Sequence, residues 1–282
     1  MEKQSTKAMV AAVAEVNAPQ KFEFLSDNTD RKVKGVVNQA GWFELNTKSD
    51  FEELKKINNP SRGSKHVPIQ HYDAVQLFGD RVSSNTNIKI DRQIGLLSPN
   101  TEKFLLMCEI KDDSIKDFSF ILGFVSFNDK TRAISVISST NAFVCSNLKI
   151  TGIMSEKQKH LNGVTDGTAK VFDLGIANFE QYRDKRVKQI ERSKNVEVDD
   201  KILSDIVLQM HRSEIFGKNP MMISNILKEF TNDIPRHDEF GSRSTLWSLE
   251  NAMTEVSKNI SPIRTIGYNQ EFDRIVDKYI TR

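Results

Sequence analysis

The sequence contains only two cysteines, Cys108 and Cys145, in 282 residues. Two thiols cannot form a disulfide framework or a four-thiolate zinc site, and so few are typical of a reducing compartment. Apolar runs are all shorter than the roughly 18 to 20 residues that a membrane span needs, and the first residues lack the apolar region of a signal peptide. The sequence therefore predicts a cytoplasmic protein without membrane association.

An excess of either charge is also missing. Forty Lys and Arg residues stand against 38 Asp and Glu residues, which leaves a net charge of +2. No long-range field commits the chain to nucleic acid or to an anionic membrane, so any such binding must use a local patch. The 38% hydrophobic content excludes disorder throughout, and the length suits one large or two small domains.

Phosphate-binding and metal-binding motifs are absent as well. Gly152 and Gly163 are isolated, so no glycine-rich phosphate loop occurs. No pair of histidines or cysteines has the His-x-x-x-His or Cys-x-x-Cys spacing that places two ligands on one face. We therefore expect no nucleotide, metal or other cofactor. The histidines are His66, His71, His160, His211 and His237.

The residue pattern changes near Gly163, from β-rich to helical. We predict an N-terminal arm at 1–20, a β-rich α+β domain at 21–162, and a helical region at 163–282 that packs on it or extends from it. The predicted fold class is α+β: an antiparallel sheet with a hairpin, followed by four or five helices.

The clearest strand covers 103–111, where apolar residues alternate. Residues 118–127 are apolar on both faces, which predicts a central strand covered on both sides. Turn residues at 128–131 join this strand to 132–137 in a hairpin. Three shorter strands are predicted at 22–25, 41–45 and 142–145.

Helices are predicted from apolar spacings of three and four. They cover 1–16, 50–57 and 71–81, with a loop at 58–64. A long amphipathic helix is predicted at 168–194. Later helices are expected to begin at Asp199 or Asp200, at Pro220, and at Ser244 or Thr245, and the last one surrounds 272–279.

Cys145 and His160 together favour a nucleophile, because a thiol needs a nearby imidazole to ionise at neutral pH. Cys145, however, follows three apolar residues at a strand end, and free cysteine is among the most buried residue types. We therefore interpret Cys145 as structural and expect no enzymatic activity.

Basic residues cluster between Arg183 and Lys194, where six of them oppose two acids. With the hairpin and the residues after the strands, this cluster predicts a groove for a nucleic-acid backbone. Phe127 or Tyr182 would stack on the bases of a single strand. The alternative is a solvated helix face beside a polar hairpin tip. The predicted contact residues are Lys130, Arg132, Lys149, Lys159, Arg183, Lys185, Arg186 and Lys188.

Five segments of the chain carry a recognisable pattern: Val67 to Tyr72, Gly123 to Asp129, Val144-Cys145-Ser146-Asn147, Lys159-His160, and Thr245 to Thr254. In these segments the chain resembles a domain-of-unknown-function family of phage and plasmid proteins, numbered nine-three-two in family catalogues. It departs from the family at Leu161, where threonine is usual. Within the last segment, Trp247 and Asn251 lie four apart, and we predict that Trp247 packs while Asn251 bonds a buried backbone group.

The resemblance implies a mobile-element origin and no established activity. The order of helix, hairpin sheet and long helix is also loosely similar to single-strand annealing recombinases such as RecT and Erf. The resulting hypothesis is a phage or plasmid DNA-metabolism protein that binds single-stranded nucleic acid, promotes annealing in DNA recombination, and acts as a homo-oligomer in the host cytoplasm. The alternative, favoured by the near-neutral charge, is a counter-defence or virion-associated factor that binds a host or phage protein.

Overall fold

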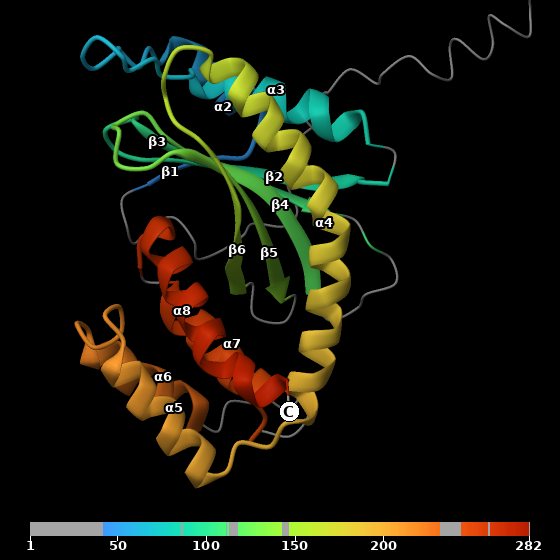
Figure 1. Cartoon of the computed structure of the whole chain (residues 1–282), viewed down its shortest axis with the longest axis vertical. Helices are drawn as coiled ribbons and strands as arrows, with labels where there is room; N and C mark the ends of the chain where they lie inside the picture. Colours follow the sequence, from blue (N-terminus) through green and yellow to red (C-terminus); the bar gives the residue numbers. More distant parts are fainter. Residues whose placement is uncertain are drawn as a thin grey trace, which may run out of the picture.

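The computed structural model describes residues 42–85, 87–110, 112, 118–142, 147–231, 244–258 and 260–281. Over these residues, six strands form one antiparallel sheet and most of the helices follow it, so the predicted α+β class is confirmed (Figure 1). The predicted N-terminal arm, the helix at 1–16 and the strand at 22–25 lie outside the described residues.

The six strands are ordered in space as they are in the chain, so each pairs with the next. From β2 to β6 the connections are short, as antiparallel neighbours allow, whereas the β1–β2 connection contains three helical segments between residues 45 and 90. Every residue of the fourth strand is buried, and that strand lies between its two neighbours, as predicted from its two apolar faces. The strands are β1 (Phe43–Leu45), β2 (Ile90–Leu97), β3 (Lys103–Ile110), β4 (Phe118–Phe127), β5 (Ile134–Ala142) and β6 (Asn147–Gln158).

Two of these strands were not predicted. One is β2, in which the polar residues Asp91, Arg92 and Gln93 follow the first residue. These polar residues interrupt the apolar pattern that the second half of the strand would otherwise show. The second is the twelve-residue β6, which pairs with β5. Strand β5 itself continues past residue 137, where its predicted range ended, through the polar residues at 138–141. The predicted strand at 142–145 falls mostly outside the described residues. Ladder pairing therefore continues through polar residues that look like a turn.

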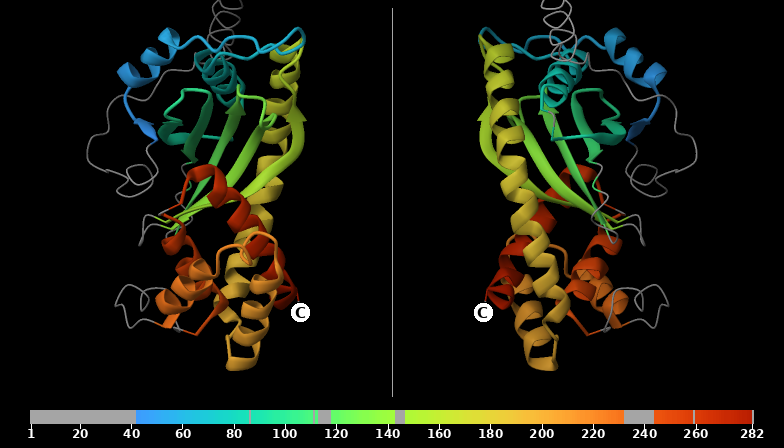
Figure 2. Two further views of the ribbon diagram at one scale, coloured as in Figure 1. Left: turned by 90° about the vertical axis from the view of Figure 1, so that its left-hand side faces the viewer. Right: turned by 90° about the vertical axis from the view of Figure 1, so that its right-hand side faces the viewer.

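One face of the sheet is covered by α3 (His71–Ser83) and by the 32-residue α4 (Val164–Asn195). Phe78 of α3 and Phe172 of α4 lie 5.4 and 5.0 Å from the Phe124 ring, centroid to centroid. Figure 2 shows α4 running along this face and beyond the sheet. The apolar spacing that predicted both helices thus reflects one shared core.

The opposite face is covered by α8 (Pro262–Ile280), whose Ile266 packs against Leu105 and Ile121 (Figure 2). This helix begins ten residues before the predicted segment at 272–279, with Pro262 in its first turn.

The rest of α8 shares a second apolar core with three other helices. Asp199 caps the first of them and Thr245 the third, two of the candidate starts considered from the sequence. These helices are α5 (Asp200–Arg212), α6 (Pro220–Thr231) and α7 (Leu246–Ser257).

Before the sheet core, α2 (Lys48–Glu53) and the 3₁₀ helix η1 (Leu54–Lys56) occupy the segment predicted as helical. Thr47 caps α2, and Asp50 accepts a hydrogen bond from the Thr47 backbone in return. The predicted loop at 58–64 follows.

Among the helices in the described ranges, none combines the length and apolar character needed to cross a membrane.

Candidate functional site

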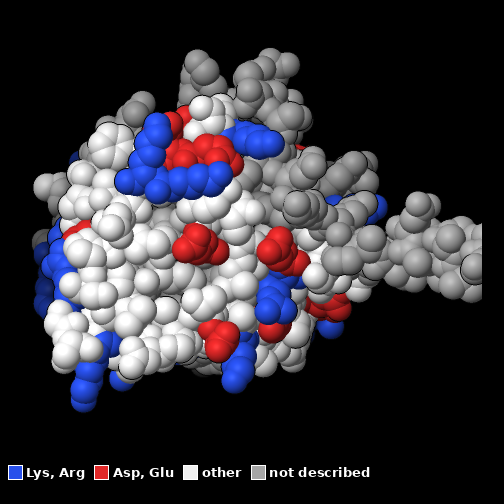
Figure 3. All heavy atoms as spheres, turned by 90° about the horizontal axis from the view of Figure 1, so that it is seen from above, with Lys and Arg blue, Asp and Glu red and all other residues white. Residues whose placement is uncertain are grey.

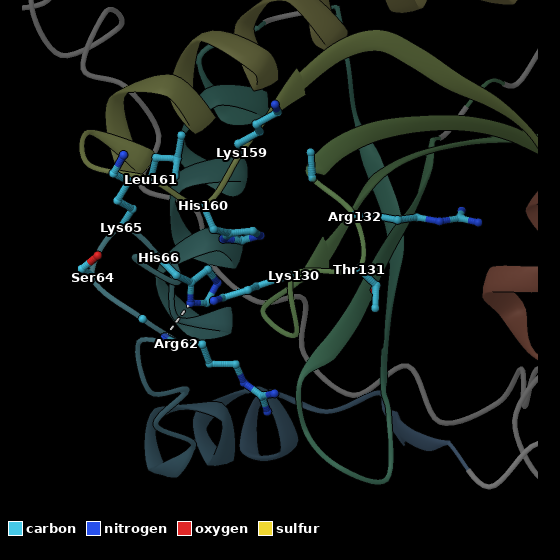
Figure 4. Close-up of a pocket in the computed structure, with 12 residues that line it drawn as sticks. Arg62, Ser64, Lys65, His66, Lys130, Thr131, Arg132, Lys159, His160 and Leu161 are labelled. Atoms are coloured by element: carbon cyan, nitrogen blue, oxygen red, sulfur yellow. Dashed lines mark hydrogen bonds between the residues drawn. The ribbon is translucent and has the colours of Figure 1, made fainter.

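A pocket of about 590 Å³ lies where three distant segments meet: the loop before α3, the β4–β5 turn, and the connection from β6 to α4 (Figure 4). None of the described residues that line it carries a carboxylate, whereas five are lysines or arginines. The lining residues are Arg62, Gly63, Ser64, Lys65, His66, Lys130, Thr131, Arg132, Ala133, Lys159, His160 and Leu161.

Backbone hydrogen bonds hold these segments together. The Val67 N–H donates to the His160 carbonyl at 3.1 Å, which joins the first segment to the third. The Asn128 side chain donates to the Ile69 carbonyl at 2.9 Å, which ties the β4–β5 turn to the segment before α3. The pocket is therefore a fixed part of the fold, formed by contacts between residues far apart in the sequence.

The β4–β5 turn positions Lys130. Asp129 accepts hydrogen bonds from the Thr131 backbone and hydroxyl at 3.0 and 2.6 Å and pairs with Lys103 at 3.2 Å. Burial opposes ionisation of Asp129, but these partners lower its pKa overall. Lys130 has φ of 69°, a left-handed conformation that residues other than glycine rarely adopt. Such outliers concentrate at functional sites.

His66 and His160 form the inner wall of the pocket. They are only 6% and 5% exposed, and their ring centroids lie 5.7 Å apart. Burial lowers the pKa of both imidazoles, to about 4 for His160, and the charges of Lys130 and Arg62 lower that of His66 further. Both rings are therefore neutral at pH 7.

The Nδ1 atom of His66 accepts a hydrogen bond from the Arg62 backbone N–H at 3.0 Å, so the proton of its neutral ring lies on Nε2. Within the described part of the chain, this Nε2 and both ring nitrogens of His160 have no hydrogen-bond partner. Buried polar atoms are normally paired, so these three nitrogens require an explanation.

Figure 4 shows Lys130 reaching toward the two imidazoles, while Lys65, Arg132 and Lys159 extend away from them. The Arg132 guanidinium lies 5.8 Å from the centre of the Phe127 ring, and Arg62 pairs with Glu102. The inner wall of the pocket is thus polar, and Lys130 is the lysine of the described lining that reaches it. The other basic residues lie around this wall. We call His66, His160 and Lys130 the inner group, and Arg62, Lys65, Arg132 and Lys159 the rim.

Lys130, Arg132 and Lys159 were predicted as contact residues, and the pocket brings them together. Arg62 and Lys65 were not among the predicted contact residues. From the sequence, His160 was considered with Cys145 and was not associated with His66, because a separation of 94 residues carries no recognisable spacing.

The basic residues of α4 lie elsewhere. At about 1.5 Å per residue, Arg183 lies roughly 28 Å along the helix from Val164 (Figure 1). Arg183 is near Asp112 at 3.9 Å, and Lys185 and Lys188 are exposed. The side chain of Lys149 is outside the described part of the structure. The predicted residues thus form two groups rather than one groove.

Arg186 differs from the other members of the predicted set. Its side chain is 4% exposed and pairs with Glu250 of α7 at 2.7 Å. Burial favours loss of its proton, but the charges of Glu250 and Asp273 outweigh burial and raise its pKa. Arg186 therefore faces the interior and does not belong to the exposed basic surface of α4.

The two aromatic residues expected to stack on bases pack against other parts of the protein. Phe127 is 2% exposed, so its assignment to a stacking surface is wrong. Tyr182 is half-buried, and its ring centroid lies 6.4 Å from those of both Phe120 and Phe179. Both aromatic side chains contribute instead to packing around the sheet.

Cys145 lies outside the described residues, whereas Cys108 is buried and burial raises the pKa of its thiol. In α7, Trp247 packs in the core of the sheet, and the Asn251 side chain donates to the Trp247 carbonyl at 2.9 Å. The structural roles predicted for Trp247 and Asn251 are confirmed.

On the face of the molecule seen from above, Lys and Arg groups lie beside Asp and Glu groups, with large uncharged areas between them (Figure 3). Two exposed ion pairs, Lys55–Glu52 and Lys56–Glu53, belong to the α2–η1 segment. Exposed pairs of this kind cancel at a distance, whereas the described lining of the pocket contains no carboxylate.

None of the family models, curated proteins and solved structures compared with the chain matches it. The resemblance to the phage and plasmid family stays a prediction.

Proposed function

We propose that the protein binds single-stranded nucleic acid and that phosphates of the strand occupy the basic pocket. One observation carries this proposal: five cationic side chains from three segments surround a concave site whose described lining has no carboxylate. Phosphate contacts with Lys and Arg supply most of the sequence-independent affinity for nucleic acids.

The shape of the site favours a single strand. A flexible strand can bend a nucleotide into a pocket of about 590 Å³, whereas a duplex presents its phosphates along a stiff rod. Lys185 and Lys188 on the exposed side of α4 supply a second contact for a longer strand.

Strand annealing, assembly into a homo-oligomer and a phage or plasmid origin complete the proposal. A monomer with a net charge of +2 has modest attraction for DNA, but an oligomer lines up one pocket per subunit along a strand. Several weak sites then act together.

The test is fluorescence anisotropy of labelled single-stranded and duplex oligonucleotides over a series of salt concentrations. Three variants each remove two positive charges: K65Q/K130Q in the pocket, K185Q/K188Q on α4, and K201Q/K218Q at exposed positions in and after α5. We expect the pocket variant to bind a single strand at least about tenfold more weakly. For this variant, the slope of log K against log salt concentration should be shallower by about 0.7 for each phosphate that it no longer neutralises.

The control variant K201Q/K218Q should bind like the unmodified protein. Equal affinities for the pocket and control variants would remove the pocket from the binding site. No binding by the unmodified protein, even at low salt, would remove the function.

A protein-interaction role is the second candidate. Leu208, Ile215 and Met221 are 45%, 36% and 65% exposed, and all three belong to the stretch from α5 to the start of α6. Exposed apolar groups close together mark interaction surfaces. A specific partner should survive nuclease and high salt in a pull-down and be lost from an L208S/M221S variant, while binding that disappears with nuclease or salt would favour nucleic acid.

A further inference from the structure

The inner group has a feature that strand binding by the rim does not use. His66 Nε2 and both ring nitrogens of His160 are buried beside the pocket, without a hydrogen-bond partner among the described residues. Among the lysines and arginines of the described lining, Lys130 is the one that reaches toward them (Figure 4). Together these three side chains offer several N–H donors around one point.

The surrounding groups keep the imidazoles neutral and leave His66 Nε2 and both ring nitrogens of His160 without a hydrogen-bond partner among the described residues. Arg62 donates its backbone N–H to His66, and Lys130 adds positive charge from the β4–β5 turn. His71 interacts electrostatically with His160, and its own Nε2 donates to the Thr101 carbonyl at 2.9 Å. Asp129 attracts His160 electrostatically but is already bonded to Thr131 and Lys103. The donors of the inner group are therefore left for a ligand.

We propose that the inner group binds a terminal phosphate monoester, so that the pocket recognises the phosphorylated end of a nucleic-acid strand. This inference rests on the proposed function and specifies its ligand. A terminal phosphate carries about −1.5 to −2 charges and three strong acceptor oxygens, whereas a phosphodiester within a strand carries a single charge. Three converging donor groups match the terminal phosphate better.

Burial supports a strand end over a strand that passes through. Because the rings of His66 and His160 are almost fully buried, they close the inner side of the pocket. The terminal phosphate contacts this wall, and the following nucleotides leave past the rim, where Lys65, Arg132 and Lys159 lie.

Binding should also take up protons. A bound dianion places negative charge beside His160, whose ring nitrogens have no hydrogen-bond partner among the described residues, and so raises the pKa that burial had lowered. His66 stays neutral, because its Nδ1 accepts the Arg62 N–H. Affinity for the terminal phosphate therefore increases as the pH falls toward about 6, the second pKa of the phosphate, and declines below it as the phosphate itself is protonated.

The experiment compares three oligonucleotides of one sequence, with a 5′-phosphate, a 3′-phosphate or two hydroxyl ends, by competition anisotropy with the full chain. We expect one phosphorylated end to bind at least about tenfold more tightly than the hydroxyl ends. Equal affinities for all three would overturn the inference and leave the proposed function standing. No binding of any oligonucleotide would overturn both.

Two substitutions of one residue provide the matched pair. H66N keeps an acceptor near the Nδ1 position for the Arg62 N–H but removes the inner donor, whereas H66Q keeps a donor near the Nε2 position. We expect H66N to lose the preference for the terminal phosphate and to retain binding of hydroxyl ends, and H66Q to keep part of the preference. If H66N fails to fold, H160N replaces it, and we expect the same loss of preference. An unchanged preference for the terminal phosphate in H66N and H160N would overturn the inference.

The rim supplies the control. K159Q should weaken the binding of all three oligonucleotides by the same factor and leave the preference unchanged. Titration calorimetry with inorganic phosphate and with a nucleoside monophosphate distinguishes the sources of the phosphate. If either binds as tightly as the phosphorylated strand, the pocket is a small-molecule site and the strand-end inference is wrong.

Discussion

At the scale of single residues, burial decides the protonation state of the histidines. His71 is fully buried, its Nε2 donates to the Thr101 carbonyl, and its ring lies 5.3 Å from the Phe104 ring. Burial lowers its pKa from 6.5 to about 4, although the Thr101 contact acts in the opposite direction. The folded protein thus holds His71 in its neutral form.

This produces a pH-dependent stability. Below pH 6.5 the unfolded chain binds a proton that folded His71 does not bind until about pH 4, so the free energy of unfolding falls across this window. The contribution of His71 is on the order of 3 kcal/mol between pH 7 and 4. H71Q, which keeps a donor for Thr101, should flatten the curve measured by denaturant unfolding at each pH. Parallel curves for the two proteins would contradict the assignment.

Arg186 shows that the environment of a charge determines its role. R186M leaves the Glu250 carboxylate buried without the guanidinium that faces it, so we expect the free energy of unfolding to fall by roughly 3–5 kcal/mol. R186M/E250Q should recover part of this loss, because the carboxylate is also gone. Single-strand binding by the folded variant should be unchanged. A decrease below about 0.5 kcal/mol, as for an exposed position, would contradict the buried pairing.

At the scale of elements, the packing of α4 on the sheet depends on Gly175. A Cβ at this position would lie 2.5 Å from a methyl group of Val136 in β5. In sequence terms, a glycine inside a helix indicates only a local loss of helix propensity. The structure shows that its lack of a side chain permits close packing.

G175A should therefore lower the free energy of unfolding by on the order of 1 kcal/mol, because overpacking costs of about 1–3 kcal/mol exceed a helix-propensity gain of up to about 1 kcal/mol. G175A/V136A should recover most of the loss. G267A in α8 is the matched control, since its nearest neighbour is an Ile215 methyl at 3.8 Å, and it should stabilise the protein in thermal or denaturant unfolding. Stabilisation by G175A would contradict this prediction, because it would mean that Val136 moves aside at little cost in free energy.

The elements that the sequence predicted well have strong local patterns. Strand β4 and helix α4 have continuous or periodic apolar residues, and their burial follows those patterns. Strand β2 and the start of α8 were missed because polar residues interrupt the pattern. Their pairing and packing partners lie elsewhere in the chain, so no local signal indicates them.

At the scale of the whole molecule, the two basic groups are separate sites. At roughly 3.4 Å per stacked nucleotide, an oligonucleotide of about six nucleotides spans about 20 Å, less than the approximately 28 Å that separates Val164 from Arg183 along α4. K185Q/K188Q should weaken a strand of about 30 nucleotides but leave the short one unaffected, as measured by anisotropy. K65Q/K130Q should weaken both. Equal effects of the two variants on the short strand would indicate a single continuous site.

The sequence by itself determined the α+β class, the central strand and the amphipathic helices, because these depend on spacings within a few residues. It also placed Lys130 at a turn between two strands. Only the tertiary structure decided that His66 meets His160, that Arg186 faces Glu250, and that Arg62 and Lys65 join the pocket. The physical reason is that the role of a polar side chain depends on burial and on the groups that face it, and folding brings those groups from distant parts of the chain.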